Sequence, residues 1–286
     1  MRYLFISNHA KQYPVSVMCH LLEVMRSGYY VWLCNKVTTR EKDDGLLLNE
    51  IEVIYKGSKD TYGSPRVYAA LRQQGRVCGR HRVARIMRLG KMVSKHHRKR
   101  QCTTDSNHNY PVAMNILDRQ FSPTALNQVW VNDITYIPTG EGWLYLAAVM
   151  DLASRRIVGW SMSSRIDKLL VSDALVAALN NRNPTAGLIH HSDRGSQYAS
   201  NDYQTLLAQH GIIPSMSRKG NCWDNAPMES FFHSMKVEWL HDLNFRTRAD
   251  ARLTIFAYIE IWYNRKRLHS TLGYRSPETY EQQIVS

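Results

Sequence analysis

Three acidic residues stand in separate segments whose residue types suit the chemistry of phosphate esters. Asp133 lies in V-W-V-N-D-I-T-Y-I, Asp193 in H-H-S-D-R-G-S-Q-Y, and Glu229 in D-N-A-P-M-E-S-F-F. Three convergent carboxylates would supply the oxygen ligands that Mg²⁺ or Mn²⁺ prefers. Two such ions about 3.5–4 Å apart can activate an attacking oxygen and stabilise a departing one. The predicted substrate is therefore a phosphodiester.

The elements that must bring these acids together are predicted from hydrophobic periodicity. The gap from Asp133 to Asp193 holds 59 residues and the gap from Asp193 to Glu229 holds 35, so distant elements have to converge. Alternating and short apolar runs predict strands, and longer periodic runs predict helices. Strands are predicted at 129–138, 143–151, 155–162, 188–193 and 212–216, with helices at 167–181 and near 200–210. This order favours a mixed α/β unit that begins with an antiparallel meander.

Each acid has a distinct expected position on these elements. Asp133 lies inside the first strand, where an ionised carboxylate is costly unless it is paired or metal-bound. Asp193 ends a short buried strand, at the edge where open sheets tend to build sites. Glu229 opens a helix whose buried stripe is expected to be Met228, Phe231, Met235 and Trp239.

Neighbouring polar residues have plainer structural interpretations. Asp151 stands in a predicted turn between strands, where Asp commonly bonds its own backbone. Asp224 precedes the Glu229 helix and is a candidate cap. Histidines near a core are more often satisfied structural groups than catalytic ones. We therefore leave the following out of the site: His190, His191 and His233.

Four motifs in order resemble the bacterial insertion-sequence transposases of the DDE, retroviral-integrase-like kind. They are W-V-N-D-I-T-Y, H-S-D-R-G-S-Q-Y, N-C-W-D-N-A-P-M-E-S-F-F-x-x-x-K and Y-N-R-K-R-L-H-S-T-L-G-Y-R-S-P-E. The similarity covers nearly the whole chain and is closest to the second-frame product (OrfB) of two-frame elements. It implies a ribonuclease-H-like core, a five-stranded mixed sheet with flanking helices, preceded by a small all-α helix-turn-helix-like DNA-binding region.

The resemblance also implies a mechanism and partners. Asp133, Asp193 and Glu229 would hold two Mg²⁺ ions, with Mn²⁺ as a substitute, for DNA end cleavage and strand transfer. Lys236, seven residues after Glu229, matches the family's basic residue and would hold DNA phosphate. The expected partners are transposon ends and target DNA, further copies of this chain, and a first-frame helix-turn-helix product joined by frameshifting.

Composition agrees with a nucleic-acid partner. The chain has 286 residues, 37 basic and 24 acidic, for a formal net charge of +13, and such an excess favours polyanions through counterion release. Five cysteines with no C-x-x-C pair indicate neither a disulfide framework nor a zinc ribbon. No signal-peptide core and no membrane-spanning run are found. We therefore expect no membrane association and a cytoplasmic, nucleoid-associated protein.

Basic residues gather in two segments that we expect to contact DNA backbone. Segment 62–100 contains no Asp or Glu, and its helices would carry arginines beside their apolar stripes. The end of the chain is predicted to be a long amphipathic helix with a basic tail, which would either contact DNA or complete the core. The predicted DNA contacts besides Lys236 are Arg66, Arg80, Arg82, Arg85, Arg88, Lys95, Arg98, Arg100, Arg265, Lys266 and Arg267.

Composition shifts divide the chain into five expected parts. The strongest boundary follows the K-H-H-R-K-R run, where polar turn-forming residues begin. A zinc site built from His96, His97 and Cys102 is not favoured, because no second ligand pair follows. The parts are an N-terminal helical region (1–60), a basic helix-turn-helix-like segment (61–104), a linker (105–122), the catalytic core (123–242) and a C-terminal helix and tail (243–286).

Two other classes of protein remain as alternatives. A metal-dependent ribonuclease-H-like nuclease would cut DNA without joining it, and the order of the four motifs favours transposition over this. A noncatalytic DNA-binding regulator of transposition would have no physical need for three convergent acids. The intact acidic set therefore favours an enzyme.

Overall fold

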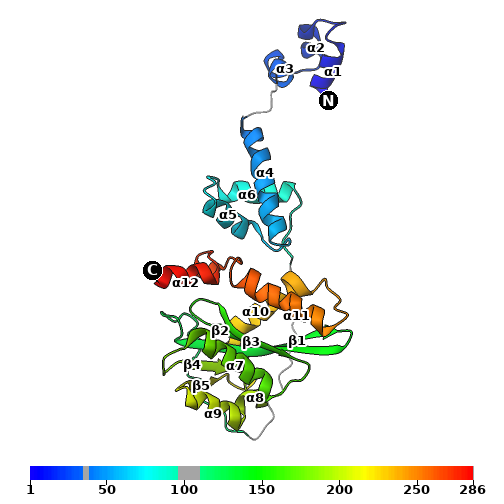
Figure 1. Ribbon diagram of the computed structural model, residues 1–286. Coiled ribbons are helices and arrows are strands. Elements are labelled where there is room, and N and C mark those ends of the chain that lie inside the picture. The colour runs from blue at the N-terminus through cyan, green and yellow to red at the C-terminus, as the bar shows by residue number, and fades with distance from the viewer. Residues whose placement is uncertain (35–38, 96–109, 286) are drawn as a thin grey trace.

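A five-stranded mixed sheet organises the C-terminal part of the chain (Figure 1). The structure, a computed structural model, describes residues 1–34, 39–95 and 110–285. Strands β1 to β3 pair antiparallel, and β4 and β5 run parallel to β1. The order is β3-β2-β1-β4-β5, which confirms the predicted sheet. Its strands are β1 (Val129–Thr139), β2 (Gly142–Asp151), β3 (Ile157–Ser163), β4 (Ile189–Ser192) and β5 (Ile213–Met216).

Helices cover both faces of this sheet because strand residues alternate between two apolar cores. On one face Trp130 of β1 packs in a core with α7 (Lys168–Arg182), α8 (Ser196–Ala199) and α9 (Asn201–Gln209). On the other face Val131 packs with α10 (Ala226–Met235), its π-helical continuation η2 (Lys236–Leu240), α11 (Arg248–Phe256) and the π-helix η3 (Ala257–Tyr263). β1 therefore lies between two helical layers.

In the described residues before β1, every regular element is a helix, as predicted. Helices α1 (Arg2–His9), α2 (Val15–Leu21) and α3 (Arg26–Leu33) share a small core that includes Ile6 and Tyr29. Helices α4 (Thr39–Gly57), α5 (Ser64–Gln73) and α6 (Arg80–Leu89) pack on one another. Because α4 belongs to this second group, the packed unit around the basic segment starts well before residue 61. Among the described residues, no helix is both long and apolar enough to cross a membrane.

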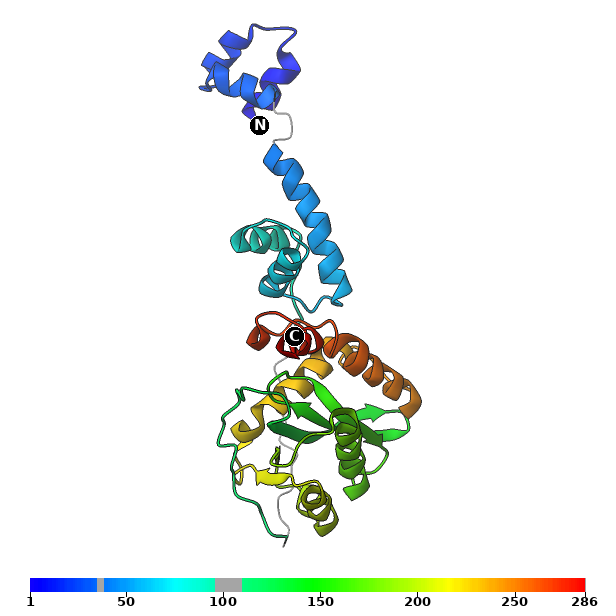
Figure 2. The ribbon, with the colours of Figure 1, turned by 60° about the vertical axis from the view of Figure 1, so that its left-hand side comes forward.

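The unit α4–α6 meets the core at the C-terminal segment (Figure 2). The hydroxyl of Tyr62 accepts a hydrogen bond of 2.8 Å from the backbone N–H of Leu268. The ring of Tyr62 lies 5.7 Å from that of Trp262. Lys95 also forms an ion pair of 2.6 Å with Asp242. Contacts from residues far apart in the sequence thus join the helical unit to the core.

The predicted C-terminal helix is present, and of the two interpretations of the segment that follows it, the structure shows a segment packed on the core, with Arg265 and Lys266 exposed. Helix α11 continues directly into η3, after which the chain turns through η4 (Ser270–Leu272) and ends in α12 (Pro277–Val285). This last helix is anchored by an acid, because Glu281 is buried and accepts ion pairs from Arg156 and Arg182. The terminal segment therefore completes the core.

Gly159 lies where β3 packs tightly against α7. A Cβ added there would lie 2.3 Å from the backbone O of Ala174 and 2.4 Å from the backbone N of Ala178. Because backbone atoms cannot move aside cheaply, we expect Gly159→Ala to destabilise the fold by about 1–3 kcal/mol. Gly45→Ala on α4 is the control, since its Cβ would meet no atom within 4 Å. Guanidinium unfolding of both variants tests this, and equal stabilities would contradict the close packing.

Candidate functional site

Asp133 lies in the middle of the central strand, paired with Ala148 of β2. Its side chain is half-buried, and its Oδ1 accepts a 2.8 Å hydrogen bond from the backbone N–H of Ile134. Burial raises the pKa of the Asp133 carboxyl well above its ordinary value, and the negative charges of Asp193 and Glu229 raise it further. Asp193 and Glu229 are therefore both near enough to Asp133 to act on its charge.

Asp193 and Glu229 approach Asp133 from neighbouring elements. Asp193 directly follows β4, which runs parallel to β1, and its Oδ1 accepts a 2.9 Å hydrogen bond from the N–H of Gly195. Glu229 lies in the first turn of α10. Asn225, which precedes this helix, donates a 2.9 Å hydrogen bond to the backbone O of Asn132 in β1. This bond fixes the start of the helix beside the residue that precedes Asp133.

The donor chemistry of this site fits a hard divalent cation. All three side chains offer carboxylate oxygens, and the mutual repulsion that raises the pKa of Asp133 is what a bound cation would relieve. Within the described ranges, however, no group of three His, Cys, Asp or Glu side chains is arranged to hold an ion. The chemistry of the residues supports metal binding, and the ligand set is a proposal.

Tyr198 is a polar group near these acids that is not apparent from the sequence pattern. It is buried, and its hydroxyl hydrogen-bonds to no group in the described part of the chain. Burial raises the pKa of Tyr198 well above its ordinary value, and the charges of Asp133 and Asp193 add to this rise. In the sequence, only its position in the S-Q-Y that follows Asp193 indicates that Tyr198 could lie near the acids. The Tyr198 hydroxyl is therefore a buried donor with no hydrogen-bond partner in the described part of the chain, within reach of the charges of Asp133 and Asp193.

Lys236 lies at the junction of α10 and the π-helix η2, a kind of irregularity that often occurs at functional sites. Its Nζ is 4.9 Å from the centroid of the Tyr136 ring on β1. Burial lowers the pKa of Lys236, and the charge of Asp133 opposes this change. The lysine therefore provides positive charge near the acids, where the sequence predicted a phosphate contact.

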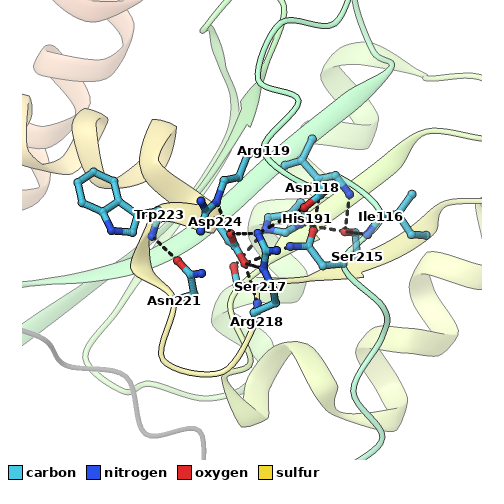
Figure 3. Close-up of polar contacts among 12 residues, drawn as sticks. Ile116, Asp118, Arg119, His191, Ser215, Ser217, Arg218, Asn221, Trp223 and Asp224 are labelled. Carbon is cyan, nitrogen blue, oxygen red and sulfur yellow. Dashed lines mark hydrogen bonds and ion pairs between the residues drawn. The ribbon is translucent and has the colours of Figure 1, made fainter.

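Asp224 organises the loop before α10, and the prediction that it caps this helix is wrong (Figure 3). It lies in the 3-10 helix η1 (Cys222–Asn225) and is fully buried. Its carboxylate accepts hydrogen bonds from the backbone and guanidinium of Arg218, from Arg119 at 2.8 Å and from Asn115 at 3.1 Å. These bonds hold the pKa of Asp224 below its ordinary value, with the Arg218 side chain as the largest cause.

Removing the Asp224 charge should destabilise the protein in a pH-dependent way. We expect Asp224→Asn to lower the free energy of unfolding by about 1–3 kcal/mol at pH 7. This loss is smaller than for a fully buried ion pair, because Arg119 and Arg218 are both half-exposed. Since the folded-state pKa is depressed, the carboxylate stabilises the fold above the unfolded-state value of about 3.9 and loses this effect as pH falls towards the folded-state pKa. Urea unfolding at pH 7 and pH 3 tests this. The prediction would be contradicted if the difference in unfolding free energy between the wild type and Asp224→Asn were the same at pH 7 and pH 3.

The structural interpretations of Asp151 and the two buried histidines are confirmed. Asp151 accepts hydrogen bonds from the backbone N–H groups of Asn127, Ala153 and Ser154. His191 bonds Ser215 at 2.9 Å and Ser217 at 3.1 Å (Figure 3). His190 contacts the side chains of Asn132 and Tyr203. Burial lowers the pKa of His190 to about 3 and that of His191 to about 4, so both rings are neutral at pH 7.

Acidic residues of α4 pair with several arginines of the basic segment. Asp44 accepts ion pairs from Arg82 at 2.6 Å and Arg85 at 2.5 Å, and Asp43 contacts Arg82 at 2.8 Å. Arg80 and Arg88 are exposed on α6. Segment 62–100 contains no acid of its own, so its sequence does not show that α4 supplies acidic partners to its arginines. The predicted contacts Arg98 and Arg100 lie outside the described residues.

Of the predicted contacts in the C-terminal segment, Arg265 and Lys266 are exposed and Arg267 is not. The Arg267 side chain is buried and forms ion-pair contacts of 2.6 and 2.8 Å with Glu238. Its prediction as a surface contact for DNA therefore does not fit the structure, because the guanidinium is already bound inside the protein. Arg66 is partly buried, 3.8 Å from the same glutamate.

Comparisons with known proteins match nearly the whole chain. Integrase core domain models match residues 123–222 and 210–277, and an HTH-like domain model matches residues 41–100. The "Insertion element IS600 uncharacterized 31 kDa protein" of Shigella sonnei is 48% identical over 93% of this chain and 97% of its own. "Transposase InsF for insertion sequence IS3A" of Escherichia coli (strain K12) is 43% identical over 100% of both chains. A solved structure, the HTLV-2 integrase catalytic core domain in complex with magnesium (trimeric form), is 14% identical over 55% of this chain and 97% of that one, with a TM-score of 0.43.

Proposed function

This chain belongs to the insertion-sequence transposases, and we propose that Asp133, Asp193 and Glu229 form the catalytic site with which it cleaves and joins DNA ends. The observation that carries the proposal is the convergence of their elements: Asp133 lies in β1, Asp193 follows the parallel neighbour β4, and Asn225 ties the start of the Glu229 helix to β1. Their elements converge at β1, and such a concentration of like charge is costly unless the site binds a cation.

We propose Mg²⁺ as the metal, in two ions for which Mn²⁺ would substitute, with the three carboxylates as protein ligands. Bound ions of this kind activate an attacking oxygen and stabilise a departing one in phosphoryl transfer. The protein's own residues set the geometry around them. Asp133 is held by the rigid centre of the sheet, Asp193 by the turn after β4, and Glu229 by the helix that Asn225 ties to β1.

Basic residues around the core would hold the DNA backbone. Lys236 is close enough to Asp133 to interact with its charge, and we propose that it contacts the phosphate beside the reacting one. The exposed side chains of Arg80, Arg88, Arg265 and Lys266 would contact phosphates further away. Arg98 and Arg100 remain proposed contacts, while Arg82, Arg85 and Lys95 would have to exchange acidic partners for phosphate.

We propose that the active form is a multimer of this chain on DNA. Joining two ends into one target requires two catalytic sites in a single complex, and closed symmetric assembly is the usual solution. A first-frame helix-turn-helix product, fused by frameshifting, is the proposed source of end recognition.

The decisive experiment is joining of labelled, pre-cut DNA ends into a plasmid by the purified chain in Mn²⁺. Glu229→Gln should abolish joined product, whereas Asp173→Asn should leave it unchanged because Asp173 is exposed on α7. Cleavage without joining in the wild type would favour the nuclease alternative. DNA binding with no reaction in any protein would favour either a missing first-frame partner or a noncatalytic regulator.

A further inference from the structure

A polar cavity of about 290 Å³ lies where the helical unit meets the catalytic core. Its wall includes Arg66 from the first turn of α5, Arg155 from the turn between β2 and β3, and Arg267 from the segment after η3. Ser230 and Ser234 of α10 also line it, while Glu229 does not. The cavity is therefore separate from the proposed carboxylate site, although α10 contributes to both.

Positive charge in this cavity exceeds negative charge. Glu238 is committed to Arg267 through contacts of 2.6, 2.8 and 3.0 Å and lies 3.8 Å from Arg66. Arg155 donates a 2.8 Å hydrogen bond to the backbone O of Phe121, and within the described part of the chain it forms no ion pair with a carboxylate. Three guanidinium groups thus line the cavity, and one carboxylate contacts two of them, which leaves an excess of two positive charges.

His269 shows that the three arginine charges converge. Burial lowers the pKa of His269 well below its ordinary value, and the charges of Arg267, Arg66 and Arg155 lower it further. The ring is therefore neutral at pH 7 and adds no charge of its own. Burial is also the main cause that lowers the pKa of both Arg66 and Arg155. Partly desolvated cations held together in this way are costly without an anion.

The shape and donors of the cavity suit a tetrahedral oxyanion. Guanidinium groups present planar forks of N–H donors that bond phosphate oxygens in pairs. Hydroxyl groups supply further donors at the wall: Ser230, Ser234, Ser270 and Thr271. The cavity volume admits a phosphate group with several waters, since each water occupies about 30 Å³ of liquid.

We propose that this cavity binds a phosphate group through Arg66 and Arg155, with Arg267 held in place by Glu238 as the positively charged wall. The phosphate belongs to the DNA backbone, an assignment that rests on the proposed function. One wall comes from the HTH-like unit and the others from the core, so a backbone phosphate bound here would connect the two parts on the same DNA.

Two binding measurements on the full chain test this proposal without divalent metal. The first titrates inorganic phosphate by calorimetry at constant ionic strength. Arg66→Gln and Arg155→Gln should each weaken phosphate binding at least about tenfold, whereas Arg165→Gln, which removes an exposed arginine elsewhere on the core, should not. Arg155→Lys keeps the charge, loses the planar fork and shares the backbone cost of a φ of 60°, so its phosphate binding should lie between that of the wild type and that of Arg155→Gln.

The second measurement determines the salt dependence of duplex DNA binding. Arg155→Gln should make the slope of log K against log salt shallower by about one phosphate contact. Loss of inorganic phosphate binding with an unchanged DNA slope would overturn the DNA assignment and leave a site for free phosphate. If Arg66→Gln and Arg155→Gln both behaved like Arg165→Gln in both measurements, the proposal that this cavity binds phosphate would be overturned. Because neither measurement needs catalysis, these results are independent of the joining assay.

Discussion

Replacing Asp133 by Asn is expected to reduce DNA joining by at least about a thousandfold and, without divalent metal, to stabilise the folded chain. The first effect follows from the loss of a carboxylate from the proposed ligand set. The second follows because the half-buried Asp133 carboxylate is partly desolvated and lies near the charges of Asp193 and Glu229. Removing that charge should stabilise the fold by about 1–3 kcal/mol. Guanidinium unfolding in a chelator and the joining assay measure the two effects.

Divalent metal provides the internal control for this prediction. Mn²⁺ should stabilise the wild type by mass action, because it binds the folded site, and should stabilise Asp133→Asn much less. Asp173→Asn should respond to Mn²⁺ as the wild type does, since its side chain is exposed on α7. If Asp133→Asn were less stable than the wild type in chelator, the prediction would be contradicted. That result would show that groups of the protein stabilise the Asp133 charge without metal.

Replacing Glu238 by Gln is expected to cause the largest loss of stability, about 3–5 kcal/mol. Glu238 and Arg267 are both buried, and the guanidinium makes contacts of 2.6 and 2.8 Å with the carboxylate. The hydroxyl of Tyr258 also donates to Glu238 at 3.2 Å. Removing only the acid leaves a buried guanidinium without its counter-charge. Chemical unfolding of the full chain measures the loss.

An exposed ion pair of the same segment gives the matched control. Arg265 lies 3.8 Å from Glu278, with most of its side chain exposed to solvent. Surface pairs of this kind contribute about 0–1 kcal/mol, so Glu278→Gln should change stability little. Equal losses in Glu238→Gln and Glu278→Gln would contradict the assignment of Glu238 as the buried counter-charge of Arg267.

The sheet and its helices were predictable because local patterns determine them. The strand predicted at 129–138 is β1, Val129–Thr139, and the helix predicted at 167–181 is α7, Lys168–Arg182. Alternating apolar residues report which faces are buried, and each segment carries that information within itself. The positions of the three acids on their elements followed from the same patterns.

Contacts between distant segments were not predictable in this way. Arg267 looks like part of a basic tail in the sequence, and only the fold brings Glu238, 29 residues earlier, to its guanidinium. Asp224 precedes a helix, as a capping residue does, but its carboxylate accepts hydrogen bonds from Arg218 and Arg119 instead of capping that helix. Likewise Asp43 and Asp44 of α4 reach the arginines of α6 through packing. Charge partners of this kind depend on tertiary structure, which periodicity does not encode.

The most direct test of the metal site is a change of ligand chemistry at Asp193. A cysteine thiolate binds Mg²⁺ poorly and accepts softer ions such as Mn²⁺ more readily. We predict that Asp193→Cys fails to join DNA ends in Mg²⁺ and that its joining activity in Mn²⁺ is at least about tenfold higher than in Mg²⁺. Asp193→Asn should stay inactive in both metals. Joining by Asp193→Asn at the wild-type rate in Mg²⁺ would contradict the proposal that these three carboxylates form the metal site of the enzyme.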